Sequence, residues 1–286
     1  MSHQEIVKAT TSFENTFKYL QDNSVIFLNF DCEICHDKMS LTKSKSLNIK
    51  MLWKCFKKKC QTTKSITFGS FFFLKKVPFT QNPWIIFYYF NNINIEKVSA
   101  MLKIERHSIG RYFDHIENAI IYSMQENFNT YKIGGNFLEV QLDETYYSNN
   151  LKIFGGVCKN TKEFFIEIVE NCSEKTLHEV IERRVEANSI IVTDGHKSYT
   201  NLKIKLPEIC KERHLVVHSK KNYKCEHGYT TNQIESLWSL LKKYVPSPPN
   251  RRYLERKILI FKFMEGKVTN YEQHYKKFLD IIRINK

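Results

Sequence analysis

Residues 137–147 read FLEVQLDETYY, in which Leu138, Val140 and Leu142 alternate with polar residues. This alternation is typical of a β-strand with one buried face. Two further strand patterns follow at hairpin distance, KIFGGVC at residues 152–158 and EFFIEIVE at residues 163–170. The three segments predict consecutive strands at the start of a domain.

After residue 172 the patterns alternate between helix and strand. The segments are SEKTLHEVIERRVE (173–186, helix), SIIVTD (189–194, strand), HLVVHS (214–219, strand) and TTNQIESLWSLLKKYV (230–245, helix). Three consecutive strands followed by alternating helices and strands predict an α/β domain with a mixed sheet and helices on its faces. This is the order of elements in an RNase H-like domain, which we place at residues 131–250.

Four cysteines precede this domain in two pairs, Cys32-x2-Cys35 and Cys55-x4-Cys60. Two thiolates in each of two tight turns suit one tetrahedral zinc ion, and eight cysteines are too few for a disulfide scaffold in a chain of 286 residues. The pattern predicts a structural zinc ribbon at residues 29–76, behind a leader of residues 1–28. Four buried thiols are the alternative.

A second group of metal-ligand types lies near the end of the domain. The residues of this group are Cys210, His214, His218, Cys225 and His227. One interpretation is that they form a second zinc site. Their spacing straddles a strand and a loop. This favours instead a place near the active site for His218, at the strand end, and His227, in the loop before the last helix, where they would stabilise phosphate charge or the loop.

The segment from Asp37 to Lys76 holds eleven lysines interleaved with aromatic residues. This pattern fits either a solvated face or a surface that contacts phosphates. Residues 77–130 predict helices, with a break at residues 103–105 and a new helix from Arg106 that resembles a helix-turn-helix. We therefore predict a helical DNA-binding module there, with a plain helical linker as the alternative, and basic C-terminal helices at residues 251–286.

Three acidic residues lie at positions from which the predicted fold could bring their carboxylates together. Asp143 is expected at the end of the first strand, and Asp194 ends the apolar strand at 189–193, before Gly195. Glu235 lies in the last helix, and Glu144 should point to the opposite face of its strand. Three converging carboxylates can hold two Mg²⁺ or Mn²⁺ ions for phosphoryl transfer. Taken singly, each would be a turn cap or a solvated residue.

The segments VQLDETYY, IIVTDGHKSYTNL and TTNQIESLWSLLKKYV, behind a zinc ribbon, resemble the Merlin group of cut-and-paste transposases and its bacterial insertion-sequence (ISXO2-like) relatives. These belong to the DDE transposases, and the resemblance extends from about residue 30 to residue 250. It implies that the acidic triad is Asp143, Asp194 and Glu235. This family often has an acidic residue where this chain has Gln141. The difference lies beside the triad and leaves the three triad acids in place.

The resemblance also implies roles for two residues of the last helix. Lys242 would lie beside the triad and touch transposon-end DNA, and Asn232 would help to place the metal or the phosphate. Some relatives use an asparagine as the third metal residue, so the division of roles between Asn232 and Glu235 stays open.

The formal net charge of +14 and the pI near 9.3 favour a polyanionic partner. Apolar runs are shorter than the roughly 20 residues of a membrane helix, so no membrane partner is expected. The first residues lack the pattern of a secretory signal, which indicates an intracellular protein, nuclear if the host is eukaryotic and otherwise cytoplasmic.

The resemblance implies a DNA transposase that cleaves transposon ends and joins them to target DNA by two-metal-ion phosphoryl transfer. Its partners would be transposon-end and target DNA and further copies of the same chain, as a dimer or a larger homo-oligomer. The alternative is a catalytically silent, domesticated transposase that acts as a zinc-containing DNA-binding protein. A third reading is a nuclease of the same fold that lacks strand transfer.

Overall fold

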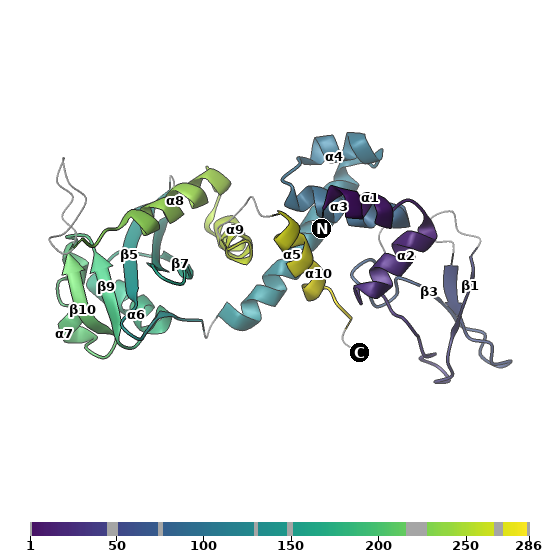
Figure 1. Ribbon diagram of the computed structural model, residues 1–286, viewed down its shortest axis with the longest axis horizontal. Coiled ribbons are helices and arrows are strands. Elements are labelled where there is room, and N and C mark those ends of the chain that lie inside the picture. The colour runs from purple at the N-terminus through teal and green to yellow at the C-terminus, as the bar shows by residue number, and fades with distance from the viewer. Residues whose placement is uncertain are drawn as a thin grey trace. The chain divides into compact units, whose positions relative to one another are not determined.

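The computed structural model describes residues 2–44, 51–73, 77–128, 131–147, 151–215, 228–265 and 271–284, except for the side chains of residues 126–128, 214 and 215. The chain forms two compact units (Figure 1). One comprises Met1–Tyr122 and Thr269–Lys286, and the other comprises Ser123–Val268. Each unit has its own sheet and its own buried core.

The first unit combines a small antiparallel sheet with helices. The strands, in spatial order, are β1 (Ser40–Lys43), β2 (Met51–Lys54) and β3 (Thr63–Ser65). The helices are α1 (His3–Ala9), α2 (Phe13–Asp22), the 3₁₀ turn η1 (Phe79–Gln81), α3 (Asn82–Phe90), α4 (Ile95–Leu102), most of α5 (Arg106–Phe128) and α10 (Tyr271–Ile281).

The aromatic residues of the lysine-rich segment are mostly internal. Trp53 and Phe72 are buried. Phe71 stacks on His115 of α5, with ring centroids 4.2 Å apart. Among the described aromatic residues of this segment, only Phe56 is exposed. Most aromatic residues of this segment therefore belong to the core of the first unit rather than to a DNA-contacting surface.

The break predicted in the helical segment is present. Helix α4 ends at Leu102, and Lys103 adopts a left-handed conformation with φ 55°. The Ser99 hydroxyl donates to the carbonyl oxygen of Ile104 at 2.7 Å, which closes the turn. Helix α5 then starts at Arg106, as the sequence predicts.

The second unit contains a five-stranded mixed sheet with the strand order β10-β9-β5-β6-β7. Strands β5, β6 and β7 are antiparallel neighbours, while β9 and β10 run parallel to β5. The strands are β5 (Glu139–Tyr146), β6 (Lys152–Cys158), β7 (Phe164–Val169), β9 (Ser189–Thr193) and β10 (Cys210–Leu215). The predicted α/β class with a mixed sheet is confirmed.

Helices cover both faces of this sheet. Helices α6 (Glu174–Arg184) and α7 (Leu202–Lys205) supply buried residues to one core, and α8 (Asn232–Tyr244) and α9 (Arg251–Phe263) supply the other. A two-stranded ribbon of β4 (Ile133–Gly134) and β8 (Val185–Glu186) and the 3₁₀ turn η2 (Lys197–Tyr199) complete the unit. Because strand side chains alternate, β6 and β7 contribute apolar residues to both cores, whereas β5 and β9 contribute apolar residues to the core with α6 and α7.

The two C-terminal helices, predicted as one block, are divided between the units. Leu254, Ile258 and Phe261 of α9 lie in the core beneath α8. In contrast, Phe278 of α10 packs edge to face on Phe71 in the first unit, with ring centroids 5.3 Å apart. No helix in the described ranges combines the length and the apolar character that crossing a membrane requires.

Two glycines in β6 allow large side chains to approach the sheet closely. A Cβ atom at Gly155 would lie 2.6 Å from Cη2 of Trp238 and 2.7 Å from the carbonyl oxygen of Phe165. A Cβ atom at Gly156 would lie 2.6 Å from Cε1 of Phe165, on the other face. Trp238 therefore lies directly against β6 because residue 155 has no side chain.

Replacing Gly155 with alanine should lower the free energy of unfolding by about 1–3 kcal/mol, because overpacking forces neighbouring groups to move. Urea titration of the purified variant measures this. The control is Gly110→Ala in α5, where the added Cβ lies 3.9 Å from Ile95 Cδ1 and the helix gains propensity. Equal stability of Gly155→Ala and the unsubstituted protein would contradict the close approach of Trp238.

Candidate active site

Asp143 lies inside β5 and not at its end, since the strand continues to Tyr146. Its parallel neighbour β9 is shorter, and the paired register includes Gln141 opposite Val192. Continuing this register by two residues places Asp143 level with Asp194, which directly follows β9. The sequence prediction was therefore wrong about the strand end, but Asp143 still lies at the carboxyl edge of the neighbouring strand, where α/β sites form.

The face of β5 that carries Gln141, Asp143 and Thr145 is turned toward α8. Gln141 is fully buried, and its side-chain oxygen accepts hydrogen bonds from the backbone N–H groups of Gln233 (3.0 Å) and Ile234 (3.4 Å). Helix α8 has no side-chain cap of its own at Thr231. The side chain of Gln141, on the sheet face that α8 covers, thus accepts hydrogen bonds from N–H groups in the first turn of the helix, which have no partner within the helix.

The amide of Gln141 is itself oriented. Its nitrogen donates to Glu139 at 3.0 Å, and the other oxygen of Glu139 accepts from Lys159 at 2.6 Å. The side-chain oxygen of Gln141 is consequently the atom that faces α8. A carboxylate at this position would lie beside the carboxylate of Glu139, which gives a physical reason for a neutral residue here.

Trp238 links α8 to Asp143. Its indole N–H donates to Oδ2 of Asp143 at 2.9 Å, and its ring is buried in the core beside Ile234 and Leu241. The sequence does not predict this hydrogen bond, because Asp143 and Trp238 are 95 residues apart. One turn further along α8, Nζ of Lys242 donates to Oγ1 of Thr145 at 2.7 Å. Helix and strand are therefore joined by hydrogen bonds at successive turns.

The carboxyl group of Asp143 is a weakened acid. Burial raises its pKa to about 6, the hydrogen bond from Trp238 opposes this rise, and the negative charges of Glu144 and Asp194 add to it. The charged groups that act on Asp143 are thus acidic, so the ionised form lacks a positive partner among them. A cation bound here would supply one.

Replacing Trp238 with phenylalanine should make Asp143 roughly tenfold weaker as an acid, since it removes a hydrogen bond to the ionised form while keeping an aromatic ring. Carboxyl-carbon NMR titration of the metal-free protein measures this. The control is Trp84→Phe, because Trp84 donates to Thr10 in the first unit. An unchanged titration of Asp143 in Trp238→Phe would show that the hydrogen bond does not form in solution.

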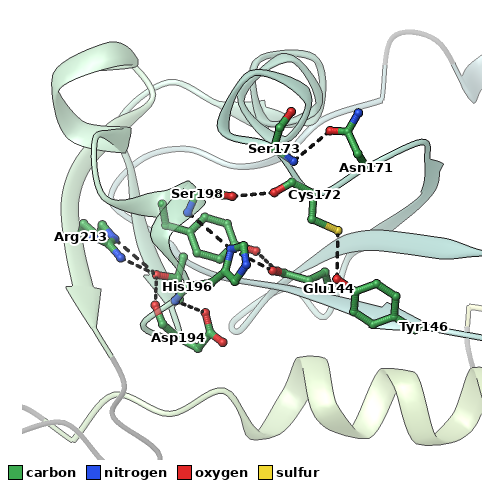
Figure 2. A network of polar contacts seen from close by, with 11 residues as sticks. Glu144, Tyr146, Asn171, Cys172, Ser173, Asp194, His196, Ser198 and Arg213 are labelled. Carbon is green, nitrogen blue, oxygen red and sulfur yellow. Dashed lines mark hydrogen bonds and ion pairs between the residues drawn. The ribbon is translucent and has the colours of Figure 1, made fainter.

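Glu144 lies on the opposite face of β5, as the strand geometry predicts. Its Oε2 accepts a hydrogen bond from the hydroxyl of Tyr199, and its Oε1 lies 3.3 Å from Nδ1 of His196 (Figure 2). The backbone N–H of His196 donates to Oδ1 of Asp194 at 2.9 Å. Burial raises the pKa of Glu144, whereas the Tyr199 hydroxyl and His196 oppose the rise. This network holds the turn that carries Asp194.

Asn232 and Glu235 lie in the first turn of α8, and both are exposed. The hydroxyl of Thr231 donates to Oε1 of Glu235 at 2.7 Å. Among the described residues, the carboxylates of Asp143, Asp194 and Glu235 do not form a group with ligand atoms all within 4.8 Å of one another. Asp143 and Asp194 thus lie on or directly after neighbouring parallel strands, and Glu235 lies on the helix that packs against β5.

Several predicted residues lie outside the described part of the chain. His218, Cys225 and His227 fall in residues 216–227, and the side chain of His214 is likewise not described. Cys210 is buried at the start of β10. The alternative second zinc site and the role of His218 therefore remain predictions.

The four N-terminal cysteines are gathered as the sequence predicts. The Sγ atoms of Cys32, Cys35, Cys55 and Cys60 all lie within 4.8 Å of one another. Cys32 and Cys60 are 3.5 Å apart at sulfur, as are Cys35 and Cys55. Hydrogen bonds from Thr62 lower the pKa of Cys60 to about 6, whereas at Cys35 a backbone hydrogen bond is outweighed by burial and the neighbouring cysteine thiols, which raise the pKa to about 12. A bound metal would hold all four as thiolates. The donor set fits a closed tetrahedral zinc site.

Sequence reasoning missed the contacts between β5 and α8. A signal was present, since Gln141, Asp143 and Thr145 share one strand face, and Trp238 and Lys242 are four residues apart on one helix face. His196 was also missed, because nothing in its local sequence pairs it with Glu144. Only the turn after β9 brings these two side chains together.

A comparison with family models finds a match to part of the chain. The model of the ISXO2-like transposase domain matches residues 148–246, which include Asp194 and Glu235 and begin after Asp143. The resemblance predicted from the sequence is confirmed over that range. No curated protein matches the chain in sequence.

Among solved structures, the catalytic core domain of BIV integrase matches part of the chain. That structure is 15% identical, covers 42% of this chain and 80% of its own, and gives a TM-score of 0.28. A second is the simian T-cell lymphotropic virus intasome in complex with PP2A regulatory subunit B56 gamma. It is 16% identical and covers 46% of this chain and 50% of its own, with a TM-score of 0.30.

Proposed function

We propose that the protein is a DNA transposase, in which an RNase H-like domain cleaves transposon ends and joins them to target DNA. The family match over residues 148–246 supports this proposal. The observation that carries it is the position of Asp143, half-buried on β5, level with Asp194 and hydrogen-bonded to the helix that carries Glu235. Acidic residues on two strands and a helix are the arrangement that metal-dependent phosphoryl transfer requires.

Asp143, Asp194 and Glu235 would hold two Mg²⁺ or Mn²⁺ ions, since oxygen ligands suit these ions and the charges around Asp143 are negative. Bound ions would activate a water or 3′-hydroxyl and neutralise the leaving oxygen. Cys32, Cys35, Cys55 and Cys60 would hold a structural zinc ion that stabilises the ribbon.

The remaining residues position this site. Trp238 holds Oδ2 of Asp143 and so orients this carboxyl group. Gln141 holds the start of α8 against β5. This fixes the position of the first helical turn, where Asn232 and Glu235 are exposed and could meet an incoming phosphate. Lys242, held at Thr145, would place a positive charge beside the triad, where it can meet the DNA backbone.

DNA binding is assigned to the zinc ribbon and to the helical module around α4 and α5, with lysines supplying the sequence-independent part of the affinity. Cutting two ends together requires a homo-oligomer of at least two chains. Such a protein works where the DNA is, in the nucleus if the host is eukaryotic and otherwise in the cytoplasm.

Nicking of supercoiled plasmid by the purified protein with Mn²⁺ tests the proposal, with EDTA, Asp194→Asn and Glu235→Gln run in parallel. Metal-dependent nicking that both substitutions abolish supports the assigned site. Nicking that persists in both variants contradicts it. Nicking without joining of cut ends would identify a nuclease that lacks strand transfer.

A second candidate function is a catalytically silent DNA-binding protein. The observation that favours it is that, among the described residues, the ligand atoms of the three carboxylates do not all lie within 4.8 Å of one another. Salt-sensitive DNA binding without nicking, even when cognate ends are supplied, would establish this second candidate.

A further inference from the structure

Two large apolar side chains are exposed next to the cysteine cluster. Ile34 is 69% exposed and Phe56 is 61% exposed. Ile34 directly precedes Cys35, and Phe56 directly follows Cys55. Scattered exposed apolar residues are ordinary on protein surfaces, but a pair at one place calls for a partner.

The cysteine cluster places these two residues at the same end of the ribbon. The sulfur atoms of Cys35 and Cys55 are 3.5 Å apart, and consecutive Cα atoms are about 3.8 Å apart. Phe56 makes no ring–ring contact with the described residues, and Nζ of Lys54 lies 5.4 Å from its ring centroid. We call Ile34 and Phe56, together with Lys57, Lys58 and Lys59, the ribbon tip.

The ribbon tip is positively charged. Residues 56–59 are all exposed. Lys57 pairs with Asp37 at 3.3 Å, whereas Lys58 and Lys59 have no acidic partner among the described residues. An exposed aromatic ring beside unpaired lysines is the chemistry with which proteins bind DNA that has accessible bases, since the ring stacks on a base and the lysines neutralise phosphates.

We propose that the ribbon tip binds DNA at an unpaired or unstacked base, with Phe56 stacked on the base and Lys58 and Lys59 on the flanking phosphates. The inference rests on the proposed function in taking DNA as the partner. It adds a contact to the base itself, made by an aromatic residue outside the catalytic domain. Ile34, which precedes Cys35 at the same end of the ribbon, would add apolar surface beside the stacked base.

The test is binding of the full-length, zinc-loaded protein to a labelled single-stranded oligonucleotide that contains 2-aminopurine. Phe56→Ala should weaken binding about tenfold and abolish the stacking-dependent quenching of 2-aminopurine. Phe56→Trp should retain both properties, whereas Phe56→Leu, which is apolar without a ring, should not. The double variant Lys58→Gln/Lys59→Gln should instead lower the slope of log affinity against log salt by about 1.4.

Phe137 provides a matched control, because it is 60% exposed and lies in the second unit before β5. Phe137→Ala should bind the oligonucleotide as the unsubstituted protein does. Unchanged affinity in Phe56→Ala overturns the proposal, as does full quenching in Phe56→Leu. If Phe56→Ala converts a dimer to a monomer without changing DNA affinity, the ribbon tip is an interface between copies of the chain, and the proposal is likewise overturned.

Failure of this inference is distinguishable from failure of the proposed function. If the protein nicks plasmid through Asp194 while Phe56→Ala binds DNA normally, only the ribbon tip is wrongly assigned. If the unsubstituted protein neither nicks plasmid nor binds DNA at low salt, both proposals fail. Zinc content equal to that of the unsubstituted protein verifies that each variant retains the ribbon.

Discussion

Replacing Asp143 with asparagine should abolish metal-dependent cleavage and at the same time stabilise the metal-free protein. A bound metal ion contributes several kcal/mol to the transition state, so the cleavage rate should fall by about 10²–10³-fold or more. DNA binding should persist, since the lysine-rich surfaces are untouched. Plasmid nicking with Mn²⁺ and DNA binding by fluorescence anisotropy measure the two effects.

The stabilisation follows from the pKa of Asp143. Burial raises this pKa from 3.8 to about 6, so between these two pH values Asp143 is largely ionised in the unfolded chain and largely protonated in the folded chain. The ionised carboxylate therefore destabilises the fold; the effect is absent below pH 4, grows up to about pH 6 and is complete above it. Asparagine removes the charge, which should gain on the order of 2 kcal/mol, or roughly 5 °C in melting temperature, at pH 7.

The control is Asp22→Asn, at the exposed end of α2, which should change neither cleavage nor stability. Thermal unfolding of the metal-free protein from pH 4 to pH 8 completes the comparison. The pH-dependent loss seen in the unsubstituted protein should be smaller in Asp143→Asn, while the contribution of Glu144 remains in both. A variant that is less stable than the unsubstituted protein at pH 7 would contradict the assigned environment of Asp143.

Replacing Cys55 with serine should remove zinc and unfold the ribbon. Structural zinc sites contribute about 10–16 kcal/mol of apparent binding free energy at neutral pH, and much of this is folding free energy. Because the strands of this ribbon are only three or four residues long, little else holds it. Elemental analysis of the purified protein and limited proteolysis at residues 29–76 measure the loss.

Cys172→Ser is the matched control, since Cys172 lies outside the cluster and accepts a hydrogen bond from Tyr146. It should retain about one zinc ion per chain and resist the protease. Full zinc content in Cys55→Ser would show that the metal, if present, is held elsewhere. Absence of zinc from the unsubstituted protein, with an ordered ribbon, would favour the alternative of four buried thiols.

Much of the second unit could be predicted because its signals are local. The alternation around Val140 and Leu142, the apolar run before Asp194 and the spacing of Ile234 and Trp238 each depend on the period of one element. The cysteine pairs are likewise local, because each pair lies in one tight turn. Predictions of this kind were confirmed for the mixed sheet and for the gathering of the four sulfur atoms.

The extent of β5 and the fate of α10 could not be predicted in this way. Strand β5 continues past Asp143 because β6 pairs with it as far as Tyr146, and such pairing depends on the partner strand. Helices α9 and α10 look alike as basic amphipathic segments, but one packs beneath α8 and the other belongs to the first unit. An amphipathic pattern indicates that a face is buried and does not say against what.

The sequence by itself determined the class of the fold, the cysteine cluster and the identity of the candidate acids, because periodicity and short-range spacing depend on neighbouring residues alone. The tertiary structure decided how those acids are held. Asp143 is hydrogen-bonded to Trp238, and the start of α8 is capped by Gln141, through contacts across more than ninety residues of chain. Such contacts exist only once the helix lies on the sheet, so the acidity of Asp143 is a property of the packed domain.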